Sequence, residues 1–449
     1  MMPNKTSALG MINGYAPDGG RRLPAATQAL IARRAAVLGS SYRLFYDEPV
    51  HFVRGEGVWL YDADGAAYLD VYNNVASIGH AQPDVVAAVS RQSATLNTHT
   101  RYLDETILDY SEELLRTLPP ELSRVIFTCT GSEANDLAYR VAKSHTGATG
   151  VIVTALAYHG VTDAVSQFSP SLGANVPLGA HVRTVAAPDS YQQPDMDVGK
   201  RLADDVRHAI EDMARHGIKP AMMICDTIFS SDGIFSHPPG FLHGAVQAVR
   251  DAGGLFVADE VQPGFGRTGE AMWGFQRHGI VPDLVTAGKP MGNGHPIAGF
   301  FAKPEIVDEF GQNARYFNTF GGNPVSCAAG RAVLQVIERD NLIDNARVVG
   351  DYLRQELSRL AQSDDRLGDI RGVGLFTGAE IVASGGTRRP DGELALRLVN
   401  DLRRNKVLIS ASGPAANVLK IRPPIVFGAD HVDHFISVFD QVLKGSREC

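Results

Sequence analysis

The sequence predicts an α/β protein with a large, doubly wound, mostly parallel sheet and a second, smaller α+β domain. The first observation is that short apolar runs alternate with helical patterns between about residues 80 and 330. The second is that this alternation stops near residue 336, where a helical pattern is followed by strand-like segments and a last helix. The third is the length of 449 residues, for which two or three structural lobes are expected.

The N-terminal part of the chain contains three expected elements. Residues 1–23 are polar and Gly-rich and are expected to form a loose arm, and residues 24–41 have the pattern of an amphipathic helix. Residues 57–73 form two alternating runs around Asp64 and Gly65, which is typical of a β-hairpin. We assign residues 1–75 to the smaller domain.

The central segment, residues 76–335, is predicted to be the large domain. Its strands are expected at residues 124–130, 149–155, 221–226, 254–261, 282–288 and 296–302. Residues 336–449 are predicted to complete the smaller domain, with strands over 373–381 and 417–427 and a final helix near 431–444.

Composition and charge argue against several classes of protein. The net charge of -8 and the absence of a basic run make nucleic acid an unlikely partner. The four cysteines are scattered without CxxC spacing, so neither a metal site nor a disulfide framework is predicted, and a reducing cytoplasm is expected. The first residues lack a signal peptide's apolar stretch, and no run of about 18 apolar residues suggests a membrane span.

One lysine stands in an unusual context. Lys289 lies in "TAGKPMGNGHP", where an apolar strand gives way to a glycine-rich turn. A charged side chain at such a place is expected to be buried. Alone, the pattern is equally consistent with a lysine whose ammonium group reaches solvent past apolar neighbours.

Three further features accompany Lys289. Asp259 and Glu260 end a very apolar strand, where a buried carboxylate needs a cation or backbone amides as partners. Thr130 and Glu133 in "TCTGSEAND" have capping-box spacing, so a helix is predicted to begin at Gly131, and its free amides suit a phosphate. Tyr158 in "ALAYHG" lies at another strand end. Taken alone, the capping box favours a plain helix start over a phosphate site, and core packing is the competing interpretation of the tyrosine.

One cofactor needs all four features together. Pyridoxal phosphate requires a lysine for its Schiff base, a carboxylate for its pyridine nitrogen, a phosphate site and an aromatic face for its ring. The four features also fall at the carboxyl ends of predicted parallel strands, where open α/β sheets bind ligands. The sequence therefore predicts a pyridoxal-phosphate site.

The motifs "GSEAND", "AYHG", "DEVQPGFGRTG", "GKPMGNGHP" and "FNTFGGNPVSCAAG" resemble the class III, or omega, aminotransferases of fold type I, from about residue 42 to 442. The resemblance implies that Lys289 is the Schiff-base lysine, that Asp259 binds the pyridine nitrogen, and that Tyr158 stacks on the ring. It further implies the following contacts: Gln262 with the phenolic oxygen, Gly131 and Ser132 with the phosphate, and Thr319 with the phosphate of the neighbouring subunit. A homodimer is implied as the minimal active unit.

Two departures from the family pattern bear on the reaction. Class III aminotransferases often bind a substrate carboxylate through an arginine that a glutamate neutralises. In "DTIFSSDG" (226–233), Asp226 replaces the first glutamate of the corresponding motif and Ser231 stands in place of the switch glutamate; in "KIRPP", Lys420 replaces the arginine. A lysine matches a planar carboxylate less well than an arginine does, but it suits phosphate as a point charge.

Other stretches resemble the phospho-lyase branch of the family, which acts on ethanolamine phosphate and phosphohydroxylysine. They are "NNVASIGH", "LNTHTRYL", "GDIRGVGLF" and "VLISASGPAANVLKIRPP". The "DTIFSSDG" stretch departs from that branch too. The first expectation is a lyase that removes phosphate from a small phosphorylated amino alcohol, with release of ammonia and an aldehyde.

Two alternatives remain open at this point. One is an omega-aminotransferase that passes an amine to pyruvate or 2-oxoglutarate, and the other is an ammonia-lyase acting on a 2-amino-1-hydroxyalkylphosphonate. The candidates for holding the substrate anion are Lys420, Arg422 and Arg101, followed by Ser77 and His80. For each cation, a structural ion pair or a solvated charge is the competing interpretation. Arg267 and Asn323 are expected to be structural, and His159 receives no role in proton transfer.

Overall fold

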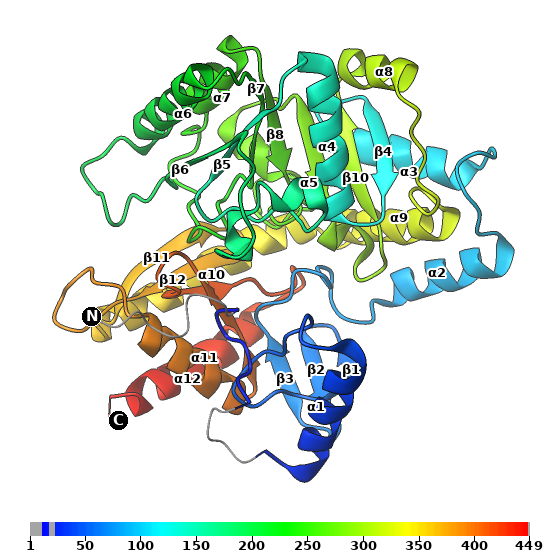
Figure 1. The fold of residues 1–449 in the computed structure, drawn as a ribbon. Helices are drawn as coiled ribbons and strands as arrows, with labels where there is room; N and C mark the ends of the chain where they lie inside the picture. Colours follow the sequence, from blue (N-terminus) through cyan, green and yellow to red (C-terminus); the bar gives the residue numbers. More distant parts are fainter. Residues whose placement is uncertain (1–10, 18–22, 448–449) are drawn as a thin grey trace.

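The computed structural model describes residues 11–17 and 23–447. Most of the arm expected at residues 1–23 therefore lies outside the described residues, as does Cys449. In the described part, a large sheet with its helices lies above two smaller sheets that bring together the two ends of the chain (Figure 1). Within the same residues, no helix is long and apolar enough to cross a membrane.

The large sheet has seven strands in the order β4-β10-β9-β8-β7-β5-β6. Its strands are β4 (Arg124–Thr128), β5 (Gly150–Thr154), β6 (Val182–Val185), β7 (Pro220–Cys225), β8 (Leu255–Asp259), β9 (Leu284–Ala287) and β10 (Ala298–Ala302). All neighbouring pairs are parallel except those of β10, which runs antiparallel to β9 and β4. The predicted mostly parallel sheet is confirmed, and only β6 was missed.

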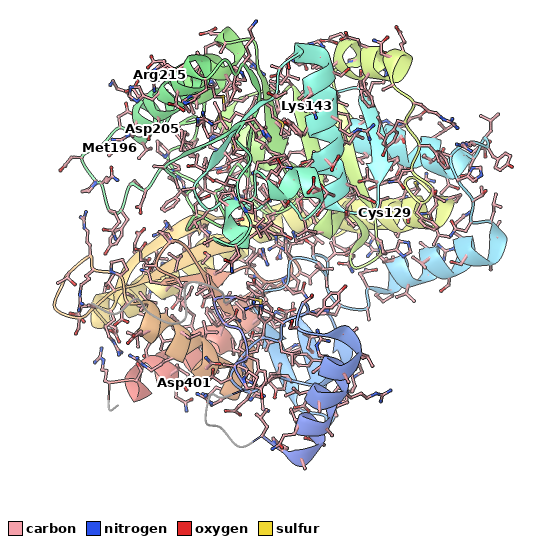
Figure 2. The ribbon with its side chains drawn as sticks, in the orientation of Figure 1. Cys129, Lys143, Met196, Asp205, Arg215 and Asp401 are labelled. Carbon is pink, nitrogen blue, oxygen red and sulfur yellow. The ribbon has the colours of Figure 1, made fainter. Side chains whose placement is uncertain are left out.

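Helices surround this sheet. They are α2 (Pro83–Thr95), α3 (Glu105–Leu115), α4 (Gly131–Thr146), α5 (Asp163–Ser166), α6 (Val198–Arg215), α7 (His243–Asp251), α8 (Pro304–Asn313) and α9 (Pro324–Arg339), with short 3-10 turns η1 (Pro170–Leu172), η2 (Gly274–His278) and η3 (Lys289–Gly292). Helix α4 packs against β10, β9 and β7, at the centre of the sheet. The outer face of α6 carries charged side chains such as Asp205 and Arg215 (Figure 2).

The two smaller sheets combine distant parts of the sequence. The first contains β1 (Phe52–Glu56), β2 (Trp59–Asp62), β3 (Ala67–Asp70) and β13 (Val407–Leu408), and the second contains β11 (Leu367–Val373), β12 (Phe376–Ile381), β15 (Val418–Ile421) and β14 (Ser410–Ser412). Helices α10 (Leu342–Ser363), α11 (Gly392–Arg404) and α12 (Ala429–Gly445) accompany them. Because β13 pairs in parallel with β3, we propose that residues 1–75 and 336–449 form one small domain.

Local chemistry explains where the sequence predictions hold and where they are wrong. The hairpin forms as expected, with Gly65 at a φ of 82° between β2 and β3. The strand expected at 373–381 is broken by Gly374, which turns at a φ of 53°. The strand expected at 417–427 ends at Ile421, since the two prolines that follow at 423–424 donate no hydrogen bonds.

Helix α1 (Ala25–Leu38) corrects another expectation. The helix forms, but none of its residues is buried, so it does not pack an apolar face against this chain. Leu30, Val37 and Leu38 are all exposed. The term amphipathic was therefore wrong for this segment.

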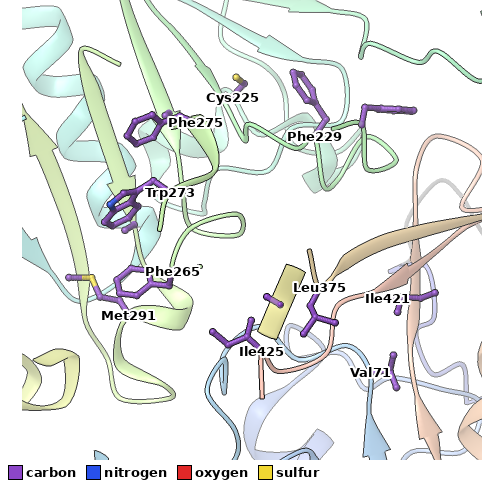
Figure 3. Close-up of a cluster of buried hydrophobic side chains, with 14 of the residues drawn as sticks. Val71, Cys225, Phe229, Phe265, Trp273, Phe275, Met291, Leu375, Ile421 and Ile425 are labelled. Atoms are coloured by element: carbon purple, nitrogen blue, oxygen red, sulfur yellow. The ribbon is translucent and has the colours of Figure 1, made fainter. Parts of the chain in front are cut away.

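The hydrophobic core is continuous from the large sheet into the C-terminal part. Phe265, Trp273, Phe275 and Met291 lie beside the large sheet, and Leu375, Ile421 and Ile425 lie across from them (Figure 3). All belong to one cluster of buried side chains. The strand β15, which carries Lys420, is thus held firmly against the domain that carries Lys289.

Candidate active site

A cavity of about 280 Å³ opens at the carboxyl ends of the parallel strands. Its walls come from the segments that follow β4, β5, β7, β8 and β9, and its lining includes Gly131, Ser132, Asn135, Tyr158, His159, Asp226, Asp259, Gln262 and Lys289. Residues separated by about 160 positions meet here because parallel strands end at the same edge of a sheet. The cofactor residues expected from this chain therefore meet in one place, except Thr319.

Lys289 opens the turn η3, directly after β9 and Gly288. Its side chain is exposed to the cavity, which corrects the expectation of a buried lysine. Burial of its amine by the cavity walls and the charge of Arg422 lower the pKa of Lys289, while Asp259 and Asp226 oppose that change. The lowered pKa of Lys289, caused by burial and by Arg422, favours the neutral, nucleophilic form of its amine.

The predicted helix start after β4 is confirmed. The Thr130 hydroxyl accepts from the Glu133 amide at 3.2 Å, and the Glu133 carboxylate accepts from the amides of Cys129 and Thr130 at 2.7 and 3.1 Å. This capping box leaves the amides of Gly131 and Ser132 at the start of α4, facing the cavity, without a hydrogen-bond partner among the described residues. A helix N-terminus with free amides is suited to a phosphate.

Two glycines make room at this end of the cavity. A Cβ at Gly131 would lie 2.9 Å from Val261, and one at Gly160 would lie 2.5 Å from the Ser132 hydroxyl. A larger residue at 160 would clash with the Ser132 backbone, and one at 131 would press on the Val261 side chain. The close approach of the two backbones is therefore a property of the sequence at these glycines.

Tyr158 forms a wall of the cavity and remains 39% exposed. The Lys289 amine lies 5.8 Å from the centre of its ring. An exposed aromatic face beside a lysine amine and a phosphate site is suited to stacking on a planar ring. This is the arrangement expected for Tyr158.

Asp259 is buried and has three donors. His159 Nδ1 and Asn135 Nδ2 lie 2.7 and 3.0 Å from Oδ2, and the Val261 amide donates to Oδ1 at 3.1 Å. Its neighbour Glu260 is different: its carboxylate accepts from the Gly274 amide, the Phe275 amide and the Thr227 hydroxyl. Burial raises the pKa of Glu260 to about 8 against these donors. Asp259 therefore fits the interpretation of a carboxylate that faces a ligand, since it lines the cavity. Glu260 fits the other interpretation, a buried carboxylate bound mainly by backbone amides.

Gln262 links the cavity to the C-terminal part. Its side-chain oxygen accepts from Arg422 Nη1, and Arg422 also donates to the carbonyl of Tyr72 at 3.0 and 2.9 Å. Burial lowers the pKa of Arg422. Arg422 therefore contacts the cavity-lining Gln262 without lining the cavity itself, and the positive charge of Arg422 lowers the pKa of Lys289.

Lys420 lies near the cavity but does not line it. The side chain is 6% exposed, and Nζ donates to the carbonyl of Ser230 at 3.0 Å. Burial and Arg422 hold the pKa of Lys420 well below its usual range, while Asp226 raises it. Asp226 itself lines the cavity and accepts from the amides of Ile228 and Ser230 at 3.0 and 3.1 Å. The loop 226–233 thus lies between the lysine and the open space.

The remaining expected substrate residues lie apart from this cavity, as does Thr319, which is expected to reach the cofactor of the neighbouring subunit. Arg101 is exposed, with its guanidinium 3.8 Å from the ring centre of Phe317, and Thr319 is exposed on the same loop as Phe317. Ser77 is buried and accepts from Arg267, while His80 pairs with Asp70 at 2.7 Å. Within one chain, none of these four side chains is brought to Lys289.

The expected structural roles are confirmed. Arg267 donates to the carbonyls of Leu375 and Pro423, and Asn323 caps α9 and donates to the carbonyl of Phe320.

No group of three potential metal ligands occurs among residues 11–17 and 23–447.

Sequence reasoning missed two residues of the site and undervalued a third. Asn135 lies one turn into α4, and Asp226 follows β7; both line the cavity. His159, which received no role, contacts Asp259. A signal existed for Asp226, since it ends an apolar strand as Asp259 does. For Asn135 the only signal was its place in the motif "GSEAND", since a polar residue in a helix is otherwise ordinary.

Comparisons with known proteins identify relatives of this arrangement. The profile of the family described as aminotransferase class-III matches residues 45–443. An alanine–glyoxylate aminotransferase 2-like protein of Drosophila melanogaster is 40% identical, covering 92% of this chain and 85% of the relative. An ethanolamine-phosphate phospho-lyase homolog 1 of Caenorhabditis elegans is 36% identical, covering 93% of each chain.

Solved structures extend the likeness to the fold. A phospholyase from Arthrobacter in complex with phosphoethanolamine has 45% sequence identity and a TM-score of 0.90, covering 92% of this chain and 99% of that one. An aminotransferase from Bacillus anthracis has a TM-score of 0.84 at 24% identity, which concerns the fold alone. The protein has the α/β fold type I that the sequence predicted.

Proposed function

The chain belongs to the class III aminotransferase family, and from that premise we propose that it is a pyridoxal-phosphate-dependent lyase. The proposed reaction removes phosphate from a small phosphorylated amino alcohol such as ethanolamine phosphate. The similarity to the phospholyase in complex with phosphoethanolamine carries this proposal, because it spans nearly the whole of both chains.

The residues around the cavity fit pyridoxal phosphate. The amides of Gly131 and Ser132 would hold its phosphate, and the glycines at 131 and 160 leave the space for it. Asp259 would hold the pyridine nitrogen, Tyr158 would cover one face of the ring, and Gln262 would contact the phenolic oxygen. Lys289 would form the covalent link.

The cofactor, when bound, supplies an aldehyde that condenses with amines and a ring that withdraws electrons from the neighbouring carbon. The Lys289 amine would take the proton from the substrate carbon that bears nitrogen. The electron pair of that C–H bond forms a double bond to the next carbon, and the C–O bond breaks with its electrons on phosphate. Water then converts the released enamine to acetaldehyde and ammonia.

The leaving phosphate needs positive charge close to the reacting carbon. Lys420 and Arg422 are the proposed sources, because both are buried basic side chains close enough for their charges to interact. A phosphate beside Lys420 would oppose the lowering of its pKa and favour its charged form. Movement of the loop 226–233 would bring Lys420 into contact with substrate. Arg101 and Ser77 remain secondary proposals, since neither lines the cavity of its own chain.

A homodimer is part of the proposal. Thr319 is exposed outside the cavity of its own chain, and the exposed aromatic side chains of Phe317 and Phe320 flank it. These features suit a loop that enters the site of a second copy and offers the Thr319 hydroxyl to the cofactor phosphate there. A cytoplasmic location is also proposed, on the basis of the free cysteines at 129, 225 and 327.

Aminotransferase activity is the second candidate, favoured by the 40% identity to the alanine–glyoxylate aminotransferase 2-like protein. The two reactions are distinguished by incubating the protein and pyridoxal phosphate with ethanolamine phosphate in the absence of any oxoacid. Phosphate, ammonia and acetaldehyde are expected in equal amounts, and none with Lys289→Ala. No release, together with conversion of the cofactor to its amine form by simple amines, would reject the lyase in favour of the aminotransferase.

A further inference from the structure

Asn135 makes hydrogen bonds to three of the segments around Lys289, although its motif, "GSEAND", gave it no individual role. It lies in α4, one turn after Gly131 and Ser132, and is 1% exposed. We infer that Asn135, fixed by Thr286, is a positioning residue that sets the orientation of the Asp259 carboxylate and of the turn carrying Tyr158. This inference rests on the proposed cofactor site.

The contacts of Asn135 reach three other segments. Its Nδ2 donates to Asp259 Oδ2 at 3.0 Å, at the end of β8, and to the carbonyl of His159 at 2.7 Å, in the turn after β5. Its Oδ1 accepts from the Thr286 hydroxyl at 2.6 Å, on β9. Thr286 stands three residues before Lys289, and His159 directly follows Tyr158. One side chain on α4 therefore connects the start of that helix to Asp259, to the turn that carries Tyr158 and to the strand that precedes Lys289.

The orientation of this amide is determined by its partners. A carboxylate and a backbone carbonyl can only accept, so the NH₂ group of Asn135 must face Asp259 and His159. The oxygen then faces Thr286, whose hydroxyl donates to it. Without that hydroxyl, the buried oxygen of Asn135 would lose its partner at the cost of an unsatisfied buried acceptor, and the amide would be held only by its two donated hydrogen bonds, free to shift relative to Asp259.

A rotated amide would place its oxygen against the Asp259 carboxylate. In the observed arrangement, Oδ2 of Asp259 accepts from both Asn135 and His159, while Oδ1 accepts only from the Val261 amide among the described residues. Each carboxylate oxygen can accept about two hydrogen bonds. Oδ1 therefore keeps a free acceptor position, and Asn135 keeps that oxygen directed to the ring nitrogen of the cofactor.

The test compares two buried threonines, on β9 and β5, whose hydroxyls donate to buried groups. Thr286→Val removes the hydroxyl that holds Asn135, and Thr286→Ser restores it. Thr154→Val is the matched control, since the Thr154 hydroxyl donates at 2.7 Å to Asp232, a buried carboxylate that does not line the cavity. For each protein we would measure the dissociation constant of pyridoxal phosphate and the pH titration of the bound cofactor's absorbance, without substrate.

Thr286→Val is expected to weaken cofactor binding about tenfold and to shift the absorbance titration, as expected for an unsatisfied buried amide. Thr286→Ser should behave as the unaltered protein, and Thr154→Val should change thermal stability alone. Equal cofactor binding and equal titrations for Thr286→Val and Thr154→Val would overturn the inference while leaving the lyase proposal intact. Failure of the unaltered protein to bind pyridoxal phosphate would overturn both.

Discussion

Lys289 and Lys420 lie at the two ends of the candidate site and differ in what surrounds their amines. Lys289 is exposed to the cavity, and the Tyr158 ring lies 5.8 Å away. Lys420 is buried on β15, its amine bound to the carbonyl of Ser230. The proposed cofactor end thus takes all but Thr319 from the large sheet and the segments that follow its strands, whereas the substrate end depends on a loop, 226–233, that separates the buried Lys420 from the cavity.

Replacement of Lys289 is expected to have the largest effect among the tests of this comparison. Lys289→Ala should lower turnover by on the order of 10³-fold or more and remove the absorbance of the covalently bound cofactor, because no other amine lines the cavity of the described chain. Lys303→Ala is the control, since Lys303 pairs with Asp283 away from the site. Turnover that survives Lys289→Ala would refute the cofactor assignment.

The second test concerns the substrate end. Lys420→Met keeps the length of the side chain but removes its charge, and it should raise the KM for ethanolamine phosphate about tenfold while leaving the dissociation constant of the cofactor unchanged. Steady-state kinetics and cofactor titration measure the two quantities separately. An unchanged KM would show that the phosphate of the substrate binds elsewhere.

A mixing experiment tests whether the site is shared between subunits. If Thr319 acts on the partner's cofactor, subunits with Lys289→Ala and subunits with Thr319→Ala should complement each other, since one site of each mixed dimer contains both native residues. Random assortment should restore about a quarter of the native activity. Activity that stays at the mean of the two separate variants would place Thr319 outside the partner's site.

The last test concerns stability rather than turnover, and it lies in the loop beside Lys420. Burial raises the pKa of Asp232 to about 6, although the Thr154 hydroxyl and the Leu156 amide oppose that change. A raised carboxyl pKa means that the folded state binds the proton more tightly than the unfolded state, so stability falls as pH rises between about 4 and 6.

Relative to Asp232→Asn, the native protein should lose up to about 3 kcal/mol of unfolding free energy across this range. Urea unfolding of both proteins at pH 4, 5 and 6 measures that difference. Parallel pH profiles for the two proteins would show that Asp232 titrates alike in the folded and unfolded states.

The sequence was most informative where function depends on local order along the chain. Apolar strands followed at once by Asp259, Lys289 or the capping box of Thr130 identified the cofactor end, because parallel strands bring their carboxyl ends to one edge. The sequence was least informative about contacts between residues that are far apart along the chain. Asn135 and Asp259 are 124 residues apart, and Lys420 and the carbonyl of Ser230 are 190 apart.

By itself, the sequence determined the α/β class, the mostly parallel sheet and the hairpin around Gly65, since these follow from hydrophobic period and turn chemistry. Family resemblance added the residues proposed to hold the cofactor. Only the tertiary structure decided that Lys289 is open to the cavity, that Lys420 is covered, and that Asn135 joins four segments. The physical reason is that exposure and hydrogen-bond partners of a side chain are set by elements packed against it from elsewhere in the chain. No local pattern records those elements.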